Sequence, residues 1–305
     1  MFKIYTDSSA NLTNDLIKLY DVGIVDLSYV NNGEITKSFN KDSDEPIKKF
    51  YEYLRAKNDL TTTCANVDDF TLAFEEDMKN GYDILYIGMS SGLSATCQMG
   101  EKALKLLKKK YPKIKTYFVD SLLASLGEGL LVYYACLQKE EGRSIEEVYK
   151  FVENTKMSIN SLFTVKTLDN LKRGGRISKL TYFFGTMTDI KPVMHVNEKG
   201  KLVSIGKAIG RKRSLNAIAE KVAKDIITPE EQTLFISHGD CLEDAKLLAE
   251  MISKKIKVQG FVYNYIDPVI GIHSGPDTLA VFFIGPSRVQ NDTVLTGSGL
   301  ADSRI

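Results

Sequence analysis

The chain has 305 residues, of which 43% are hydrophobic and 26% are charged. These proportions are typical of a globular protein with a core of its own, and they exclude a disordered or fibrous chain. The formal net charge is +1, so the overall charge predicts no attraction to nucleic acid.

The cysteine pattern and the length of the apolar runs indicate where in the cell the protein is expected. The four cysteines are scattered without a C-x-x-C pair, which argues against a zinc site or a disulfide framework and favours a reducing cytoplasm. Asp7 comes too early in the chain for a signal peptide, and no apolar run reaches the ~18 residues of a membrane span. We therefore expect a cytoplasmic protein without stable membrane insertion.

The first predicted strand, Phe2 to Tyr5, ends in the polar sequence T-D-S-S. Ligands of open α/β sheets gather at the carboxyl ends of strands, so residues Thr6 to Ser9 are candidates for a site. A helix cap explains them equally well. A second strand is predicted over Val22 to Tyr29, followed by a helix over Pro46 to Ala56.

Three consecutive threonines then occur in L-T-T-T-C-A-N. Their restricted χ1 angles disfavour a helix, so this segment is predicted to be extended, and it leads into a helix capped by Asn66 or Asp68. The threonine hydroxyls matter for a site only if they face the next polar turn of the chain, which contains Ser94.

That turn is the stretch Met89 to Gly100, between a short buried strand, D-I-L-Y-I-G, and an amphipathic helix. A helix N-terminus with unpaired N–H groups favours an anion, and Gly92 allows a ligand to approach the backbone. The alternative is simple helix capping by Ser90 or Ser91. Four hydroxyl side chains crowd the turn: Ser90, Ser91, Ser94 and Thr96.

A third strand, Thr116 to Val119, again ends in Asp-Ser, and the following helix, Leu122 to Gln138, is apolar on all sides and is therefore predicted to be buried. Strand, polar turn and helix have now occurred three times. This order predicts an α/β fold with a parallel sheet, and we assign residues 1–158 to an N-terminal domain.

The pattern changes after residue 158. A strand, a short helix closed by Gly174 and Gly175, and a β-hairpin around N-E-K-G-K precede further alternating helices and strands. We predict a C-terminal mixed α/β domain over residues 159–288, with a cleft between the two domains, and a disordered tail over residues 289–305.

Metal and nucleotide motifs are absent from the sequence. The three histidines have no ligand spacing, and neither a G-x-S-x-G elbow nor a Walker loop occurs, so no metal or cofactor is predicted. His273 is expected in a turn between Gly271 and Gly275, where a structural role is the alternative. Arg176 follows a double glycine, a position that also suits a surface cation or a C-cap partner.

Six short motifs in order carry a family resemblance: T-D-S-S-A, S-S-G-L-S-A-T-C-Q, V-D-S-L-L-A-S-L-G-E-G, L-K-R-G-G-R-I-S, I-K-P-V-M and G-I-H-S-G-P-D. Together they resemble the DegV family, which includes the fatty-acid-binding subunits of bacterial fatty acid kinase. The resemblance extends from Ile4 to about Gly285. It implies a two-domain α/β protein that encloses one long-chain fatty acid between its domains.

The resemblance also implies a set of site residues. In the family a threonine, a serine, a histidine and an arginine hold the carboxylate, and we add the backbone at Gly92 as a further suitable donor. The chain departs from the family pattern at Asp277, where a glycine is usual, and at Ile209, where an arginine is common. The implied carboxylate-binding residues here are Thr62, Gly92, Ser94, Arg176 and His273.

Two further sets are proposed for the acyl chain and for a partner. Core packing explains the first set equally well, and a solvated helix face explains the second. The candidates for lining the acyl chain are Leu180, Phe183, Phe184 and Met187, and those for docking a kinase are Lys207, Arg211, Lys212 and Arg213.

Three functions remain open at this point. The first is a binding subunit, without a catalytic centre of its own, that encloses a fatty acid and presents its carboxylate to a separate ATP-dependent kinase for acyl phosphate formation. The second is an independent serine hydrolase acting on a lipid or ester through Ser94, although no His–Asp pair is recognisable beside it. The third is a regulatory or structural protein with an incidental lipid.

Overall fold

The computed structural model describes residues 1–38, 45–56, 60–177 and 189–290. Four strands form a fully parallel N-terminal sheet in the order β2-β1-β6-β7. The two central strands, β1 and β6, are largely buried, as expected for a sheet covered on both faces. The strands are β1 (Phe2–Asp7), β2 (Gly23–Val25), β6 (Asp83–Gly88) and β7 (Thr116–Asp120).

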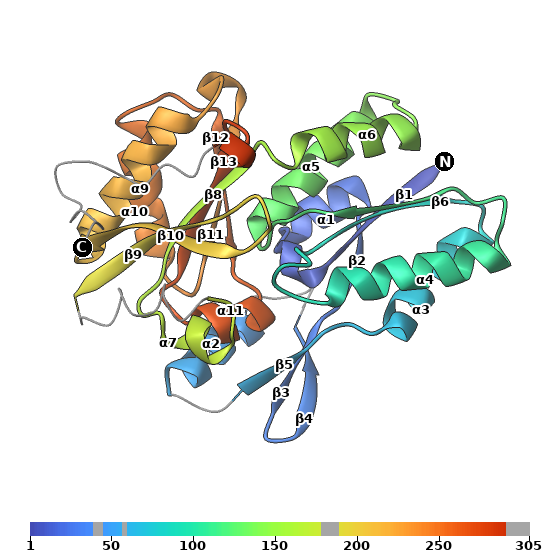
Figure 1. The fold of residues 1–305 in the computed structure, drawn as a ribbon, viewed down its shortest axis with the longest axis horizontal. Coiled ribbons are helices and arrows are strands. Elements are labelled where there is room, and N and C mark those ends of the chain that lie inside the picture. The colour runs from blue at the N-terminus through green and yellow to red at the C-terminus, as the bar shows by residue number, and fades with distance from the viewer. Residues whose placement is uncertain (39–44, 57–59, 178–188, 291–305) are drawn as a thin grey trace.

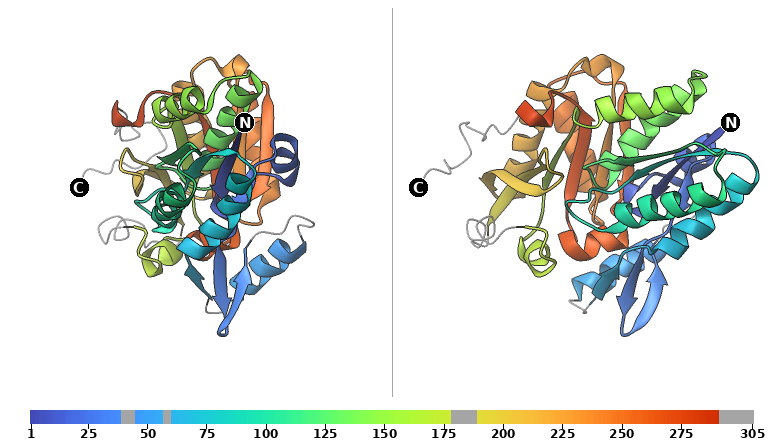
Figure 2. Two further views of the ribbon diagram at one scale, coloured as in Figure 1. Left: turned by 90° about the vertical axis from the view of Figure 1, so that its right-hand side faces the viewer. Right: turned by 45° about the vertical axis from the view of Figure 1, so that its right-hand side comes forward.

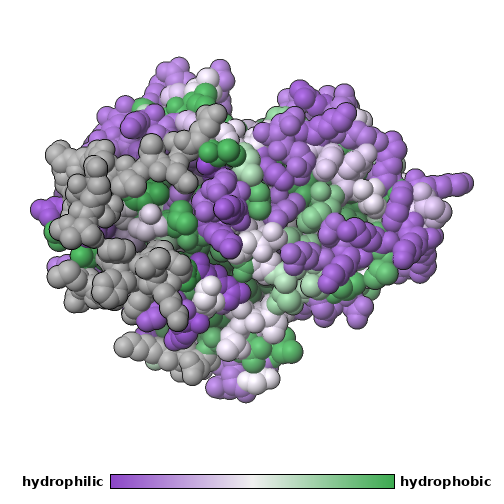
Figure 3. Space-filling view, in the orientation of Figure 1, coloured by the Kyte–Doolittle hydropathy of each residue, from purple (hydrophilic) through white to green (hydrophobic). Residues whose placement is uncertain are grey.

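Helices cover both faces of this sheet (Figure 1). On one face of the sheet, Ile4, Leu85 and Val119 share a hydrophobic core with α5. On the other face, Tyr5 and Tyr86 share a core with α3 and α4. Hydrophilic residues dominate the outer surface around α4 and α6 (Figure 3), so the apolar sides of these helices face inward. The helices are α1 (Asn14–Tyr20), α3 (Val67–Lys79), α4 (Thr96–Lys110), α5 (Leu126–Glu140) and α6 (Ile145–Thr155).

Six strands form a mixed C-terminal sheet in the order β10-β9-β8-β13-β11-β12, in which only β11 and β12 are parallel neighbours. Helices α9 (Arg211–Asp225) and α10 (Leu242–Ser253) cover one face. The predicted hairpin is confirmed as β9 and β10. The strands are β8 (Ile159–Thr164), β9 (Ile190–Val196), β10 (Leu202–Ile209), β11 (Thr233–His238), β12 (Gly260–Tyr265) and β13 (Leu279–Ile284).

Helix α5 lies between the two sheets, as the oblique view in Figure 2 shows. Leu126, Leu130 and Leu131 of α5 share one core with Ile4 of the N-terminal sheet and with Phe282 of the C-terminal sheet. Two sheets contact this helix, which is why its sequence is apolar on all sides. The predicted α/β fold with a parallel N-terminal sheet and a mixed C-terminal sheet is confirmed.

A small antiparallel sheet extends below the N-terminal sheet in Figure 1. Its strands are β3 (Ser28–Asn31), β4 (Glu34–Lys37) and β5 (Leu60–Thr63), in the order β4-β3-β5. Helix α2 (Glu45–Arg55) packs beside it against α11 (Pro268–Ser274). The predicted single strand over Val22 to Tyr29 is therefore wrong, because the chain leaves the first sheet after Val25 and joins another at Ser28.

Other sequence expectations fare differently. His273 lies in the last turn of α11 and not in an irregular turn, since Asp267 caps this helix by accepting from Val269 N at 2.7 Å. The short helix before Arg176 is confirmed as α7 (Asp169–Arg173).

The proposed acyl-lining residues Leu180, Phe183, Phe184 and Met187, and the tail after residue 290, lie outside the described residues. The described residues also include three 3-10 turns: Ser8–Ala10, Pro229–Glu231 and Arg288–Gln290.

Candidate functional site

A cavity of about 310 Å³ lies between the two halves of the molecule. Its volume is at the lower end of the usual range for small-molecule sites. The N-terminal half contributes loops and strand ends, and the C-terminal half contributes a sheet face and α11. Four of the five predicted carboxylate-binding residues line this one cavity: Thr62, Ser94, Arg176 and His273.

Ser94 sits in the tight turn between β6 and α4. The turn closes on Ser90, whose carbonyl oxygen accepts from Leu93 N at 3.0 Å and from Ser94 N at 3.1 Å. The Ser94 hydroxyl pairs with Thr96 Oγ1 at 2.9 Å and accepts from Thr96 N at 3.2 Å. The N-cap residue of α4 is Ala95, and no side chain makes a cap hydrogen bond there, so the alternative of simple capping by Ser90 or Ser91 is wrong. Ser94 also reaches the cavity.

Gly92 is not among the cavity-lining residues. A Cβ atom at this position would lie 2.7 Å from Lys199 O and 2.9 Å from Gly200 O. Its N–H group is also used, because it donates to Ser90 Oγ at 3.1 Å. The missing side chain lets the β9–β10 turn approach, so the close contact is with this protein's own backbone.

Thr62 and His273 meet although 211 positions separate them in the sequence: Thr62 Oγ1 lies 2.9 Å from His273 Nε2. The other ring nitrogen, Nδ1, is buried without a hydrogen-bond partner among the described residues. Burial, and then the nearby charges of Arg176 and Arg173, lower the pKa of His273 to about 4. The imidazole is therefore neutral near pH 7. Its Nδ1 faces Gly174, where a Cβ atom would lie only 2.2 Å from it.

Arg176 reaches the cavity from beyond α7. Its Nε donates to Leu93 O at 3.2 Å, and Nη1 donates to Gly174 O. These two bonds fix the guanidinium between the N-terminal turn and the loop after α7. The side chain is partly buried, and burial lowers its pKa.

A buried carboxylate supports the turn from below. Asp7, at the end of β1, accepts from Met89 N at 3.2 Å, from Tyr86 OH at 3.1 Å and from Ser9 N at 3.1 Å. Burial raises its pKa, and these hydrogen bonds oppose that rise. Residues Thr6 to Ser9 were candidates for a cap or a site, and the structure assigns Asp7 to holding the turn in place.

Glu128 of α5 also supports the turn that contains Ser94. No pattern in the sequence indicated this role. It accepts from Thr6 Oγ1 at 2.8 Å, and its second oxygen lies 3.0 Å from Ser9 Oγ. The Ser9 hydroxyl has one proton for contacts with two carboxyl groups, so one of the two, Asp7 or Glu128, must carry a proton. Burial and the charge of Asp7 raise the pKa of Glu128 in agreement with this count.

The remaining cavity wall combines apolar and hydroxyl side chains. Neither the apolar nor the hydroxyl side chains of this wall were predicted from the sequence, because only the tertiary fold brings together the strands and helices that carry them. Apolar members include Leu27, Phe163, Leu171, Val196, Ile266 and Phe282, and hydroxyl members include Ser125, Ser161, Ser237, Ser274 and Thr278.

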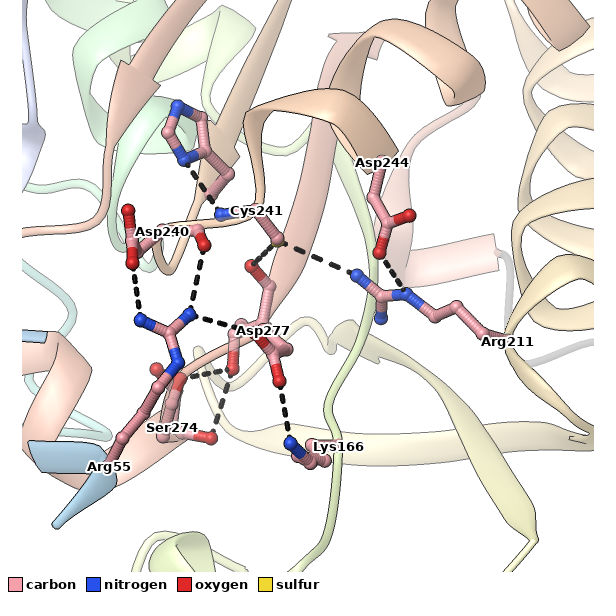
Figure 4. A network of polar contacts seen from close by, with 11 residues as sticks. Arg55, Lys166, Arg211, Asp240, Cys241, Asp244, Ser274 and Asp277 are labelled. Atoms are coloured by element: carbon pink, nitrogen blue, oxygen red, sulfur yellow. Dashed lines mark hydrogen bonds and ion pairs between the residues drawn. The ribbon is translucent and has the colours of Figure 1, made fainter. Parts of the chain in front are cut away.

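An ion-pair network ties α2 to the C-terminal half (Figure 4). Arg55 bonds the Asp240 carboxylate and donates to Asp277 Oδ1 at 3.0 Å, while Lys166 donates to the other Asp277 oxygen at 2.9 Å. Asp277 has φ +64°, a conformation that favours glycine. The family departure at this position thus coincides with two cation contacts.

The proposed docking cations lie at the start of α9 and at the end of β10. Lys212 and Arg213 are exposed, and Lys207 is half-buried. Arg211 differs from the expectation of a surface cation, because its Nε donates to Asp244 at 2.8 Å (Figure 4). The exposed Ile209 lies beside them.

Fold and site together define a class: an α/β protein whose parallel and mixed sheets enclose one cavity with hydroxyl, imidazole and guanidinium groups on an otherwise apolar wall. Within the described residues no group of three or more His, Cys, Asp or Glu side chains could hold a metal ion. Nor is any helix there long and apolar enough to cross a membrane.

The chain belongs to the DegV family: the family model, described as "Uncharacterised protein, DegV family", matches residues 1–285. A DegV domain-containing protein of Clostridium perfringens is 44% identical over 288 residues, covering 94% of this chain and 98% of the relative.

Solved structures agree with this assignment. A DegV lipid-binding protein from Thermotoga maritima is similar with a TM-score of 0.82 and 28% identity, covering 94% of this chain and 100% of that one. DegV of Bacillus subtilis, described as a fatty acid binding protein, is similar with a TM-score of 0.79 and 26% identity, covering 93% and 99%.

Proposed function

We propose that this protein binds one long-chain fatty acid in the cavity, with the carboxylate at Thr62, Ser94, Arg176 and His273. The observation that carries the proposal is that these residues, from four separate segments, line one cavity whose other wall residues are largely apolar. The descriptions of the Thermotoga maritima and Bacillus subtilis relatives as lipid-binding and fatty-acid-binding proteins support it.

The chemistry of the site suits an amphiphile. Burying a carboxylate is costly unless donors and a positive charge meet it, and two hydroxyls with a guanidinium meet that need. Each CH₂ group of the tail contributes about 0.8 kcal/mol when it is buried against apolar side chains. The neutral His273 can add a hydrogen bond or take up a proton beside the carboxylate.

No observation favours the serine hydrolase alternative. Ser94 Oγ pairs with Thr96, and the hydrogen-bonded partner of His273 in the described part of the chain is Thr62. A nucleophilic serine requires a base within hydrogen-bond reach. We therefore propose a binding protein without a catalytic centre of its own.

We further propose that the bound carboxylate is presented to a separate ATP-dependent kinase, which transfers a phosphoryl group to one carboxylate oxygen. The exposed pair Lys212 and Arg213, with Lys207 and Arg211 beside it, is the proposed docking surface. Charge complementarity at such a surface raises the association rate. The division into domains 1–158 and 159–288 and the cytoplasmic location stay predictions from the sequence.

The binding proposal is tested by organic extraction and mass spectrometry of protein purified under native conditions, which should give about one fatty acid per chain.

Combined Thr62→Ala and Ser94→Ala substitutions remove two donors, each worth about 1.5–3 kcal/mol to a charged acceptor. Affinity for a labelled fatty acid should fall at least about 10-fold, with an unchanged circular dichroism spectrum. Ser91→Ala, in the same turn but exposed, is the matched control. Unchanged affinity of the double variant would refute this assignment.

The docking surface has its own test. Lys212→Glu with Arg213→Glu should slow acyl phosphate formation by the cognate kinase, and the effect should shrink as salt screens exposed charges. Lipid affinity should be unchanged. Arg211→Gln separates docking from structure, because Arg211 is already paired with Asp244. Full kinase-dependent activity of the double reversal at low salt rules out this surface.

A further inference from the structure

The cavity wall has more hydrogen-bonding capacity than a carboxylate uses. Ser125, Ser161, Ser237 and Ser274 all line it and are 6%, 2%, 0% and 6% exposed, respectively. Ser274 Oγ has no hydrogen-bond partner among the described residues. Burying hydroxyl groups beside an alkyl chain costs free energy unless a partner is present.

The strand register orders these groups along the cavity. Ser237 of β11 lies opposite Ala280 of β13, and Ser161 of β8 lies opposite Phe282, two residues further along β13. A two-residue step corresponds to about 7 Å. Thr278, just before β13, donates to Ser274 O at 3.0 Å, and Ser274 follows His273. A chain that starts at His273 therefore passes Ser237 before Ser161.

Ser237 is part of a hydroxyl chain with a defined polarity. Ser125 Oγ lies 2.6 Å from Asn11 Oδ1 and 2.9 Å from Ser237 Oγ. The amide oxygen can only accept, so it takes the single Ser125 proton, and Ser237 supplies the proton of the second bond. Both serine oxygens then keep lone pairs but have no free proton. At this level of the cavity the wall can accept a hydrogen bond and cannot donate one.

Ser125 is held in this chain at a conformational cost. Its backbone has φ +57° and ψ −150°, close to a region that is essentially restricted to glycine. Such strain is maintained only where the surrounding structure requires it. Here the strained residue places its hydroxyl between the α5 N-terminus and the C-terminal sheet.

We propose that the cavity accepts, at the Ser125–Ser237 pair, a fatty acid whose chain bears a hydroxyl group some distance from the carboxylate. The ligand hydroxyl donates to a serine oxygen and thereby fills the acceptor capacity of the pair. This inference rests on the proposed fatty acid binding and refines its substrate class. A ketone at the same carbon cannot donate, so the pair should discriminate hydroxy acids from oxo acids.

The test is a competition assay with stearic acid and a positional series of hydroxystearic and oxostearic acids. In a purely apolar cavity a hydroxyl should weaken binding about 5- to 160-fold, from a burial cost of about 1–3 kcal/mol at 1.36 kcal/mol per tenfold change. We expect at least one mid-chain hydroxy isomer to bind as tightly as stearic acid or more tightly, and at least 5-fold more tightly than its oxo counterpart.

Variants separate this inference from the binding function. Ser237→Ala should lower the affinity for the preferred hydroxy isomer, relative to that for stearic acid, at least 5-fold, whereas Ser91→Ala should leave this ratio unchanged. Ser125→Gly, which relieves the positive φ, should act like Ser237→Ala even if the latter folds poorly. If stearic acid binds but every hydroxy isomer is at least 10-fold weaker, this inference fails and the binding function stands. If no fatty acid binds, both fail.

Discussion

The two halves of the molecule build the cavity in different ways. The N-terminal half contributes side chains such as Ser94 from a loop at the end of a parallel strand. The C-terminal half contributes Ser161, Ser237 and Phe282 from the faces of paired strands. A strand face is fixed by its own ladder, but a loop needs separate support, and Asp7 with Glu128 supplies it beneath the turn. The polar loop of the N-terminal half therefore depends on a buried pair of carboxyl groups, whereas the strand faces of the C-terminal half do not.

The largest expected effect comes from removing that support. Asp7→Ala leaves Met89 N, Tyr86 OH and the Ser9 donors without their acceptor, and each unsatisfied buried group costs about 1–3 kcal/mol. We expect the free energy of unfolding in urea to fall by at least about 3 kcal/mol. Asp15→Ala, at an exposed position in α1, should cost less than about 1 kcal/mol. Similar losses for the two variants would contradict the supporting role of Asp7.

The second-largest effect is expected on the pH dependence of stability. It arises from His273, which contacts Thr62 where the two halves of the molecule meet. The pKa of His273 is lowered from 6.5 to about 4 in the folded protein. The stability contributed by the neutral ring is therefore present above pH 6.5 and is lost as the pH falls toward 4. At 1.36 kcal/mol per pH unit the loss is up to about 3 kcal/mol.

Urea unfolding between pH 7.5 and pH 4.5 checks this linkage. Wild type without fatty acid should lose about 2–3 kcal/mol more than His273→Gln, which has no group titrating in this range. Bound fatty acid should reduce the difference, because a carboxylate beside His273 favours its protonated form. Parallel pH profiles of the two proteins would show that the ring does not titrate as expected.

The smallest effect is expected in the ion-pair network of Figure 4. Asp277→Gly removes the ion pairs with Arg55 and Lys166, which are partly exposed and contribute about 0–1 kcal/mol each. It also relieves a positive φ. The net change in unfolding free energy should stay below about 1 kcal/mol, and the salt dependence of stability should weaken.

Asn32→Gly is the matched control for that substitution. Asn32 also has a positive φ, at 49°, and it is exposed in the β3–β4 turn. It should therefore gain the backbone effect without any change in salt dependence. A loss of several kcal/mol for Asp277→Gly would mean that the network in Figure 4 holds α2 in place far more strongly than exposed ion pairs usually do.

The sequence by itself determined the fold class, because alternating apolar strands, polar turns and amphipathic helices are local patterns with fixed periods. Six motifs also indicated the family, and Thr62, Ser94, Arg176 and His273 follow from matching them. The burial of α5 was predictable too, since a helix that is apolar on all sides has no solvent face.

Tertiary structure decided what depends on contacts between distant segments. The approach of Thr62 to His273, the stacking of Gly92 on the β9–β10 turn and the Asp7–Glu128 pair all join residues far apart in sequence. The break between Val25 and Ser28 belongs here as well, because both pieces have strand-like sequences and only their partners differ. Periodicity describes which face of an element is buried, but it contains no information about which other element will cover that face.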